Sequence, residues 1–534
     1  MTVRPPVLYW FKQRWLLFLN LLVFVIFKFQ HLFYPYFFDE SWWYYPAVKL
    51  MYTHGPSLLP TAIDPEYSRG HPLLFHCLYA IWMRFFGTSH FSMHSFALII
   101  SLCVLFAVYE IGLKLFNLRV AAISTFLVST QVVFFVQASY VLPEILVALF
   151  ILLSLHYYSS RRMLLTSIFL FLALFTKESA LIAAAVLGID AFVGLFRPDR
   201  KVMENVQSFF VVSAPVILIA VFFLLQKQAY GWLIHPVHSG LIDLSWDTFF
   251  TKFSNNAFYL LVYDYRVWLN IILLIFPIVA AIQHRSMKYI YWLLVPFLII
   301  FIFFYRHDVV DSIGHKIYFL IILFSGVFLI GGLSKFTYFF GHAKSTFIRV
   351  SLSFIFCYAI YCSLSFITYR YLVSSLVPML ILSAVFIDFF INSTRNFVAW
   401  PIYIVLGTVF IMSYKFNTEQ TAGDSSLESF HTMTVHQKTI EYCEQHQLYE
   451  KDIDACSSHL YNSLRDEKFG NLNKGRRFTR VTLRTGNREA EYTLVDNIDS
   501  FYSYNTIKND TGRRLVFRAK SGNEWAEIYT RKPH

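Results

Sequence analysis

Charged residues are scarce in this sequence. Of its 534 residues only 15% are Asp, Glu, Lys or Arg, whereas 57% are hydrophobic, and the mean hydropathy is +0.51. A soluble domain of this length cannot present so little charge to water. The composition therefore excludes a soluble protein and predicts a chain that has the lipid bilayer as part of its solvent.

Several familiar signals are also missing. The sequence has no internal repeat, which disfavours a transporter built from two symmetric half-chains, and no nucleotide-binding glycine loop. No small-residue cleavage motif follows the first apolar run, so this run is predicted to be a retained span and not a signal peptide. The formal charge of +12 comes from basic residues scattered between apolar runs. That pattern indicates cytoplasmic anchoring and anionic lipid as partners and excludes nucleic acid.

Long apolar runs dominate what is present. A helix needs about 20 residues to cross the hydrocarbon core of a bilayer. About thirteen runs approach this length, and they are 15–33, 92–113, 119–137, 142–159, 163–176, 178–196, 208–226, 258–283, 288–304, 315–334, 346–368, 370–392 and 397–414. The sequence therefore predicts an all-α polytopic membrane domain over residues 1–415.

The basic residues predict the orientation of these spans. If the N-terminus is cytoplasmic, every inner connection is basic, as the positive-inside rule requires. An odd number of spans then places the polar tail, 416–534, outside the cytoplasmic (inner) membrane. Cys443 and Cys456 lie in this tail at a spacing that permits a disulfide in an oxidising compartment, although the sequence leaves their pairing open.

Two non-spanning regions have their own patterns. The first outer segment, 34–91, contains Ser41–His54 and Pro72–Gly87, which are rich in aromatic and aliphatic residues and are expected to form two interfacial helices. The tail alternates charged with β-branched or aromatic residues and carries glycine turn signals. It is expected to be a small α/β or mostly β domain.

Asp39 and Glu40 are adjacent acids directly after the first span, in a strongly apolar setting. Either they cap a new helix, or one of them takes a proton from an acceptor hydroxyl at the membrane surface. Further ionisable residues stand at the outer ends of other spans, among them Glu144 and a set of cations. The cations and histidines of this set are Arg69, His71, Lys177, His235, His238, Arg306, Lys316 and Arg370.

As a set, these residues favour one reaction type. Fixed cations suit a phosphate leaving group, which departs without a general acid, so that transfer by direct displacement needs only one base. Glycoside hydrolysis would need a second, protonated carboxylate. Alternatively, His71, His235 and His238 hold a divalent metal, although they show no recognised ligand spacing, and the sequence leaves a metal cofactor open.

Several of these residues lie in short segments that share an order along the chain. The segments are Asp39–Glu40, Gly70–Leu74, Gln137–Tyr158 with Pro143–Glu144, Leu174–Lys177, Gly314–Tyr318 and Tyr369–Tyr371. Over roughly its first 400 residues the chain resembles the multi-pass glycosyltransferases of the C-type fold that use polyprenyl-phosphate sugars. This family includes the protein O-mannosyltransferases and the lipid A aminoarabinose transferase.

The resemblance implies roles for individual residues. Asp39 is expected to be the base, with Glu40 as its partner or alternate, and Glu144 is expected to be a second or acceptor-side acid. The donor phosphate would be bound by His71, Lys177, Arg306, Lys316 and Arg370. His71 stands where the family has lysine, which leaves open whether it binds phosphate, binds a metal or leaves this role to Arg69.

The resulting prediction is an inverting glycosyltransferase. It would move a sugar from a polyprenyl-phosphate donor to a protein hydroxyl, lipid A or a polysaccharide at the outer face of the membrane. The alternative is a flippase for a lipid-linked saccharide, which would also need cations for phosphate but no base. The sequence leaves the sugar and the acceptor open.

Overall fold

The computed structural model of this chain describes residues 6–196, 202–264, 266–270, 341–364, 368–393, 399–415, 423–472, 475–483, 490–498 and 504–532. Two predicted phosphate-binding residues, Arg306 and Lys316, lie outside the described residues. The predicted spans 288–304 and 315–334 also lie outside them, as does most of 258–283.

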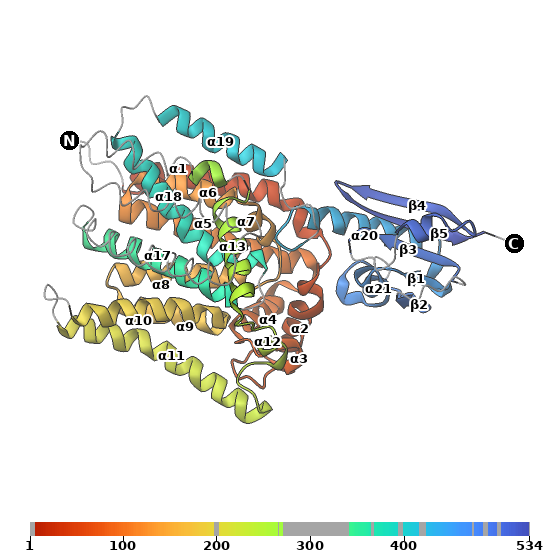
Figure 1. Cartoon of the computed structure of the whole chain (residues 1–534), viewed down its shortest axis with the longest axis horizontal. Helices are drawn as coiled ribbons and strands as arrows, with labels where there is room; N and C mark the ends of the chain where they lie inside the picture. Colours follow the sequence, from red (N-terminus) through yellow and green to blue (C-terminus); the bar gives the residue numbers. More distant parts are fainter. Residues whose placement is uncertain are drawn as a thin grey trace.

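Long apolar helices lie side by side in one bundle (Figure 1). In a bilayer every backbone N–H and C=O must be satisfied within the segment, which is why apolar runs of this length form helices. The long helices are α1 (Pro6–Lys28), α5 (His90–Ile111), α10 (Leu181–Leu195), α11 (Val202–Tyr230), α17 (His342–Leu364) and α18 (Val373–Ser393).

Six helical segments among the described residues are long and apolar enough to cross a membrane. They are Trp10–Phe33, His90–Phe116, Glu178–Leu195, Val206–Tyr230, His342–Leu364 and Tyr369–Phe389. The protein is therefore a multi-pass membrane protein. The predicted number of about thirteen spans is not confirmed.

Shorter helices fill the bundle. They are α6 (Leu118–Ser129), α7 (Val132–Gln137), α8 (Glu144–Ser159), α9 (Met163–Thr176) and α19 (Ala399–Lys415), with the short turns η3 (Gly112–Phe116), η4 (Glu178–Ala180) and η6 (Tyr369–Leu372). Helix α8 lies at the centre, because it packs against α5, α9, α17 and α18. It is almost wholly buried, which explains why its sequence has no polar face.

The segment predicted to be the first outer one, 34–91, is helical in both places expected from the sequence. The short turn η1 (Phe29–Phe33) precedes it, and it contains η2 (Glu40–Tyr44), α2 (Tyr45–His54), α3 (Pro65–Ser68) and α4 (Leu74–Phe86). These elements gather at the end of the bundle that faces the C-terminal region (Figure 1). After α11 the chain forms two further helices, α12 (Pro236–Ser239) and α13 (Trp246–Leu261).

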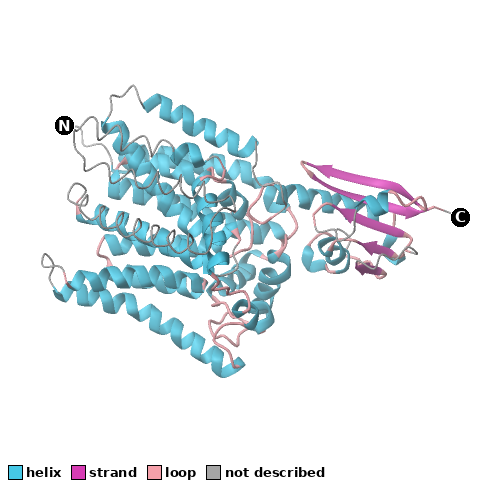
Figure 2. Ribbon diagram, viewed as in Figure 1, coloured by secondary structure: helices cyan, strands magenta, loops and turns pink. Residues whose placement is uncertain are grey.

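The C-terminal region is α/β and projects from the bundle (Figure 2). Its sheet has the order β2-β1-β3-β5-β4, with β1 parallel to β2 and β3, and β5 antiparallel to β3 and β4. The strands are β1 (Ile453–Ala455), β2 (Val481–Leu483), β3 (Tyr492–Asp496), β4 (Arg513–Ser521) and β5 (Glu524–Arg531). The helices and turns are α20 (Glu428–Gln445), η8 (Leu448–Glu450), α21 (Ser458–Arg465), η9 (Glu467–Phe469) and α22 (Tyr504–Lys508). The predicted boundary between 415 and 416 falls at the start of a stretch outside the described residues.

Candidate active site

The chain turns sharply just before Asp39. Phe38 has a φ of 41°, a left-handed conformation that is uncommon for a bulky side chain. The turn η2 that follows is π-helical, a geometry that is frequent at functional sites. Ser41 steadies the turn by donating hydrogen bonds from its backbone N–H (2.9 Å) and its hydroxyl (2.8 Å) to the Phe38 carbonyl. This local geometry places the Asp39 carboxyl on the outside of the turn and the Glu40 carboxyl on its inside.

Glu40 is fully buried, and its carboxyl is occupied. Its Oε1 accepts a hydrogen bond from the backbone N–H of Val141 (2.8 Å) and lies 2.8 Å from Nε2 of His94. Its Oε2 accepts a hydrogen bond from the backbone N–H of Phe37 (3.1 Å). These contacts join the first outer segment to α5 and to the chain before α8, so they give Glu40 a structural role in this arrangement.

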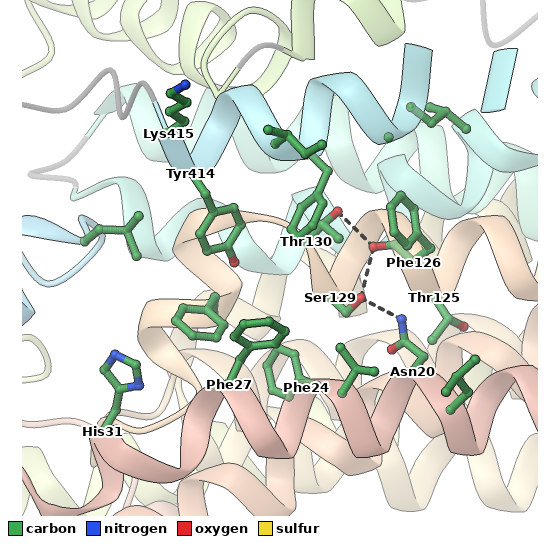
Figure 3. Close-up of a pocket in the computed structure, with 18 of the residues that line it drawn as sticks. Asn20, Phe24, Phe27, His31, Thr125, Phe126, Ser129, Thr130, Tyr414 and Lys415 are labelled. Carbon is green, nitrogen blue, oxygen red and sulfur yellow. Dashed lines mark hydrogen bonds between the residues drawn. The ribbon is translucent and has the colours of Figure 1, made fainter. Parts of the chain in front are cut away.

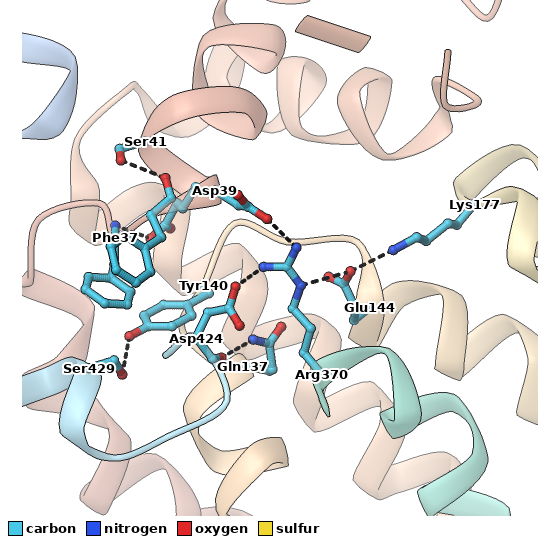
Figure 4. A network of polar contacts seen from close by, with 12 residues as sticks. Phe37, Asp39, Ser41, Gln137, Tyr140, Glu144, Lys177, Arg370, Asp424 and Ser429 are labelled. Atoms are coloured by element: carbon cyan, nitrogen blue, oxygen red, sulfur yellow. Dashed lines mark hydrogen bonds and ion pairs between the residues drawn. The ribbon is translucent and has the colours of Figure 1, made fainter. Parts of the chain in front are cut away.

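Asp39 has a different environment. Its Oδ2 lies 2.5 Å from Nη2 of Arg370, and its side chain keeps 34% of its exposure, against 1% for Arg370. The guanidinium of Arg370 also contacts the carboxylates of Asp424 and Glu144, the latter with Nε 3.4 Å from Oε1 (Figure 4). The buried guanidinium of Arg370 therefore pairs with three carboxylates, of which that of Asp39 is the most exposed.

The chain of charges continues from Glu144 to Lys177. Nζ of Lys177 lies 2.8 Å from Oε1 of Glu144, with both side chains buried, and it also lies 3.7 Å from the centre of the Tyr371 ring. The ion pairs thus connect Asp39 to Arg370, Arg370 to Glu144, and Glu144 to Lys177, as Figure 4 shows. Removing a single buried member would leave a charge without its partner, a situation that typically costs about 3–5 kcal/mol.

Asp424 belongs to this cluster, although no sequence pattern pointed to it. It lies between α19 and α20, where it contacts Arg370, and its backbone carbonyl accepts a hydrogen bond from the side chain of Gln137. Burial raises the pKa of Asp424 to about 6, against the lowering effect of Arg370. A loop acid shows no pattern that predicts such a long-range contact, so sequence reasoning missed it.

His71 lies next to this chain but is not a member of it. Its Nδ1 is 2.8 Å from Oε2 of Glu178, the residue after Lys177. Its ring centre lies 4.9 Å from that of His238, and the rings of His235 and His238 are 6.0 Å apart. Burial, followed by the charge of His71, lowers the pKa of His238 to about 4.

The three histidines predicted as alternative metal ligands are therefore neighbours. Nevertheless, within the described part of the chain, no group of three or more His, Cys, Asp or Glu side chains has an arrangement that holds a metal ion. Arg69, the other candidate for phosphate binding, lies flat on Trp43, with its guanidinium carbon 3.4 Å from the ring centre.

The structure thus brings together four of the residues singled out from the sequence. Asp39, Glu144, Lys177 and Arg370 form one continuous chain of charges, to which Asp424 is added. Glu40 is turned away into the protein, and the histidines form a separate group beside Lys177. The roles proposed for these residues remain predictions.

Comparisons with known proteins find distant likenesses. No protein-family model matches the sequence, and no curated protein matches it. The similar solved structures include ArnT from Cupriavidus metallidurans in the apo state, the S. cerevisiae protein O-mannosyltransferase complex bound to the sugar donor, and the oligosaccharyltransferase AglB from Archaeoglobus fulgidus.

These likenesses are partial. ArnT is 14% identical with a TM-score of 0.40, over 69% of this chain and 59% of that one. The O-mannosyltransferase is 15% identical with a TM-score of 0.33, over 44% and 35%, and AglB is 14% identical with a TM-score of 0.40, over 85% and 63%. This chain spans less than two thirds of the length of each. The resemblance expected from the motifs is confirmed as a likeness, and at these identities it assigns no role to any residue.

Proposed function

We propose that this protein is an inverting glycosyltransferase that uses a polyprenyl-phosphate sugar. The observation that carries the proposal is the contact between Asp39 and Arg370. It joins the most exposed acid of the site to a fixed cation, at the start of a strained turn. A base and a phosphate-binding group are the two elements that direct displacement from a lipid phosphate requires.

In the proposed reaction the acceptor hydroxyl oxygen attacks the anomeric carbon of the donor. The bond from this carbon to the phosphate oxygen breaks, and its electron pair leaves with the polyprenyl phosphate. Asp39 takes the proton of the acceptor hydroxyl. Because this is a single displacement, the anomeric configuration inverts.

Arg370 and Lys177 supply positive charge where the leaving phosphate gains negative charge. Both are already held in place by carboxylates, so little reorganisation is needed when the charge develops. Glu144 sits between them and fixes their separation. Arg69 and His71 directly follow α3, and we propose them as further contacts of the donor phosphate.

The proposed location is the inner membrane, with the N-terminus in the cytoplasm and the C-terminal region outside. The basic residues between the apolar runs support this orientation. The candidate site lies at the end of the bundle that carries the C-terminal region, so the acceptor would be met outside the cytoplasm. Accessibility of single cysteines introduced at residues 200 and 510 to a membrane-impermeant maleimide in intact cells tests this orientation.

The decisive experiment is transfer by purified full-length protein in lipid nanodiscs. The donor is a radiolabelled polyprenyl-phosphate sugar mixture, the acceptor is a membrane extract, and Asp39→Asn is the matched variant. Label that leaves the carrier only when Asp39 is intact supports the proposal. Labelled lipid that crosses a vesicle membrane without leaving its carrier would instead support the flippase, and transfer by Asp39→Asn at the wild-type rate would exclude Asp39 as the base.

A further inference from the structure

A large cavity lies between α1, α6 and α19, away from the chain of charges (Figure 3). Its volume is about 1250 Å³, and residues of α20 and Ser521 of β4 line the end nearest the C-terminal region. Most of its wall is apolar and comes from the three membrane helices, including Phe24, Phe126 and Phe410. A cavity of this size and lining is suited to a ligand with a long hydrocarbon chain.

The cavity borders the bilayer. Leu19 and Phe27 of α1 and Ile411 of α19 line it and are also exposed on the surface of the bundle. Helix α1 is long and apolar enough to cross a membrane, and α19 is a shorter apolar helix, so we place these exposed side chains against lipid. A hydrocarbon chain can therefore enter from the side without crossing water.

Two buried polar atoms line the cavity without hydrogen-bond partners among the described residues. They are Nδ1 of His31, whose side chain is more than nine-tenths buried, and Oδ1 of Asn20. A buried polar group without a partner costs about 1–3 kcal/mol. Oδ1 of Asn20 can only accept a hydrogen bond, whereas Nδ1 of His31 can donate one to an anionic head group. His31 marks the end nearest the C-terminal region (Figure 3).

The charge of the lining indicates the polar group of that ligand. Within the described residues, no Asp or Glu lines the cavity, whereas His31, His431 and Lys415 do. His31 follows α1 and His431 lies in the first turns of α20, so both imidazoles belong to the end nearest the C-terminal region. A lining without carboxylates and with imidazoles at one end favours a phosphate-bearing head group there.

The cavity is separate from the candidate active site. Phe430 lines its end, and the ring of Phe430 packs on Tyr140 (6.0 Å between centres), which in turn packs on Phe37 (6.3 Å). Phe37 is two residues before Asp39. These three rings therefore lie between the cavity and the turn that carries Asp39, and neither Asp39 nor Arg370 lines the cavity.

We infer that this cavity is a binding site for a bilayer phospholipid, distinct from the sugar donor. One acyl chain lies along α1, α6 and α19, and the head group lies at the end of the cavity that carries His31 and His431. The inference does not depend on the proposed glycosyltransferase reaction.

Gly407 offers a direct test. It lines the cavity, and a Cβ added there would meet nothing within 4 Å, so a larger side chain can occupy the space without a backbone clash. Replacing glycine inside a helix also favours the helix. Gly407→Trp should fill part of the cavity. Ile404→Trp is the matched control, because Ile404 lies on the same helix and is exposed but does not line the cavity.

The measurement is photo-cross-linking in nanodiscs of phosphatidylglycerol that contain a small fraction of the same lipid with a diazirine on one acyl chain. Labelled peptides are then mapped by mass spectrometry. We expect label on the cavity-lining parts of α1, α6 and α19, reduced by about tenfold in Gly407→Trp, since excluding even two methylene groups from contact has an effect of this size. Ile404→Trp should keep the wild-type labelling.

Two results would overturn the inference. One is label spread over the exposed faces of the bundle, including α11, at the same level in both variants. The other is displacement of the label from the cavity by added polyprenyl phosphate, which would make the cavity a carrier site. If Gly407→Trp does not insert stably, Gly407→Leu provides the same comparison with a smaller change.

Discussion

Arg370 Nη2 lies 2.5 Å from Asp39 Oδ2, although 331 positions separate the two residues in the chain. Asp39 comes from the first outer segment and Arg370 from η6, directly before α18. The contact therefore joins the beginning and the end of the membrane domain at one point. Glu144 and Asp424 contact the same guanidinium, and Lys177 pairs with Glu144.

The adjacent acids Asp39 and Glu40 should respond differently to neutral replacement. Asp39→Asn should abolish transfer and leave the thermal midpoint nearly unchanged, because Asp39 is partly exposed. Glu40→Gln should destabilise the protein by about 1.5–3 kcal/mol, the usual worth of a hydrogen bond to a charged group. Transfer assays and thermal unfolding in the same nanodiscs give both readouts. Loss of activity in Glu40→Gln with an unchanged midpoint would reverse the two assignments.

Sugar transfer should require the planar guanidinium of Arg370 and not only its charge. Lysine keeps the charge but cannot reach three carboxylates with a planar fork. We expect Arg370→Lys to lower transfer by about 100-fold or more, the size of effect seen when a preorganised charge donor is lost. Transfer at a near-normal rate in Arg370→Lys would show that only the charge matters.

Asp424 should give the protein a specific pH dependence. Its pKa in the folded protein is about 6, above the unfolded value, so between these two values the folded state binds the proton and the unfolded state does not. Its contribution to stability is thus fully present below the unfolded pKa and is lost as the pH rises through about 6. The difference in thermal midpoint between wild type and Asp424→Asn should shift in favour of wild type as the pH falls from 7 to 5. Parallel curves would contradict this.

Cys443 and Cys456 are free thiols in the structure, and both are buried. Burial raises the pKa of each thiol to about 12, so neither is reactive at neutral pH. We expect a reducing agent to leave the thermal midpoint unchanged and a maleimide to modify both residues only after unfolding. A lower midpoint on reduction, together with a mass change of two hydrogens, would show that they form a disulfide.

His459 should link the C-terminal region to the candidate site. Its ring packs on Phe37 and Phe38 (5.7 Å to each) and lies beside His436, which in turn contacts Asp496. Burial and His436 lower the pKa of His459 to about 3, so its ring is neutral at physiological pH. His459→Ala should lower kcat more than it raises KM, because the turn that carries Asp39 loses its support. His446→Ala, on the exposed end of α20, is the control.

Sequence patterns alone were enough to predict a multi-pass membrane protein and to single out the adjacent acids Asp39 and Glu40. The thickness of the bilayer sets the length of helix that crosses it, so long apolar runs can be recognised as spans from the sequence. Asp39 stands out because it is a charged residue among apolar neighbours directly after the first span. The same local reading singled out Glu144, Lys177 and Arg370 at span ends, since ionisable residues are expensive near lipid and stand out there.

The different environments of Asp39 and Glu40 became visible only once the chain was folded. Asp39 and Glu40 look equivalent in sequence, but the left-handed turn at Phe38 directs one towards Arg370 and the other into a buried set of hydrogen bonds. Asp424 joined the site through a contact 54 positions away from Arg370, and loops carry no periodic signal that predicts such contacts. The cavity beside α19 was also beyond the sequence, because a void depends on how helices pack and not on the composition of any one of them.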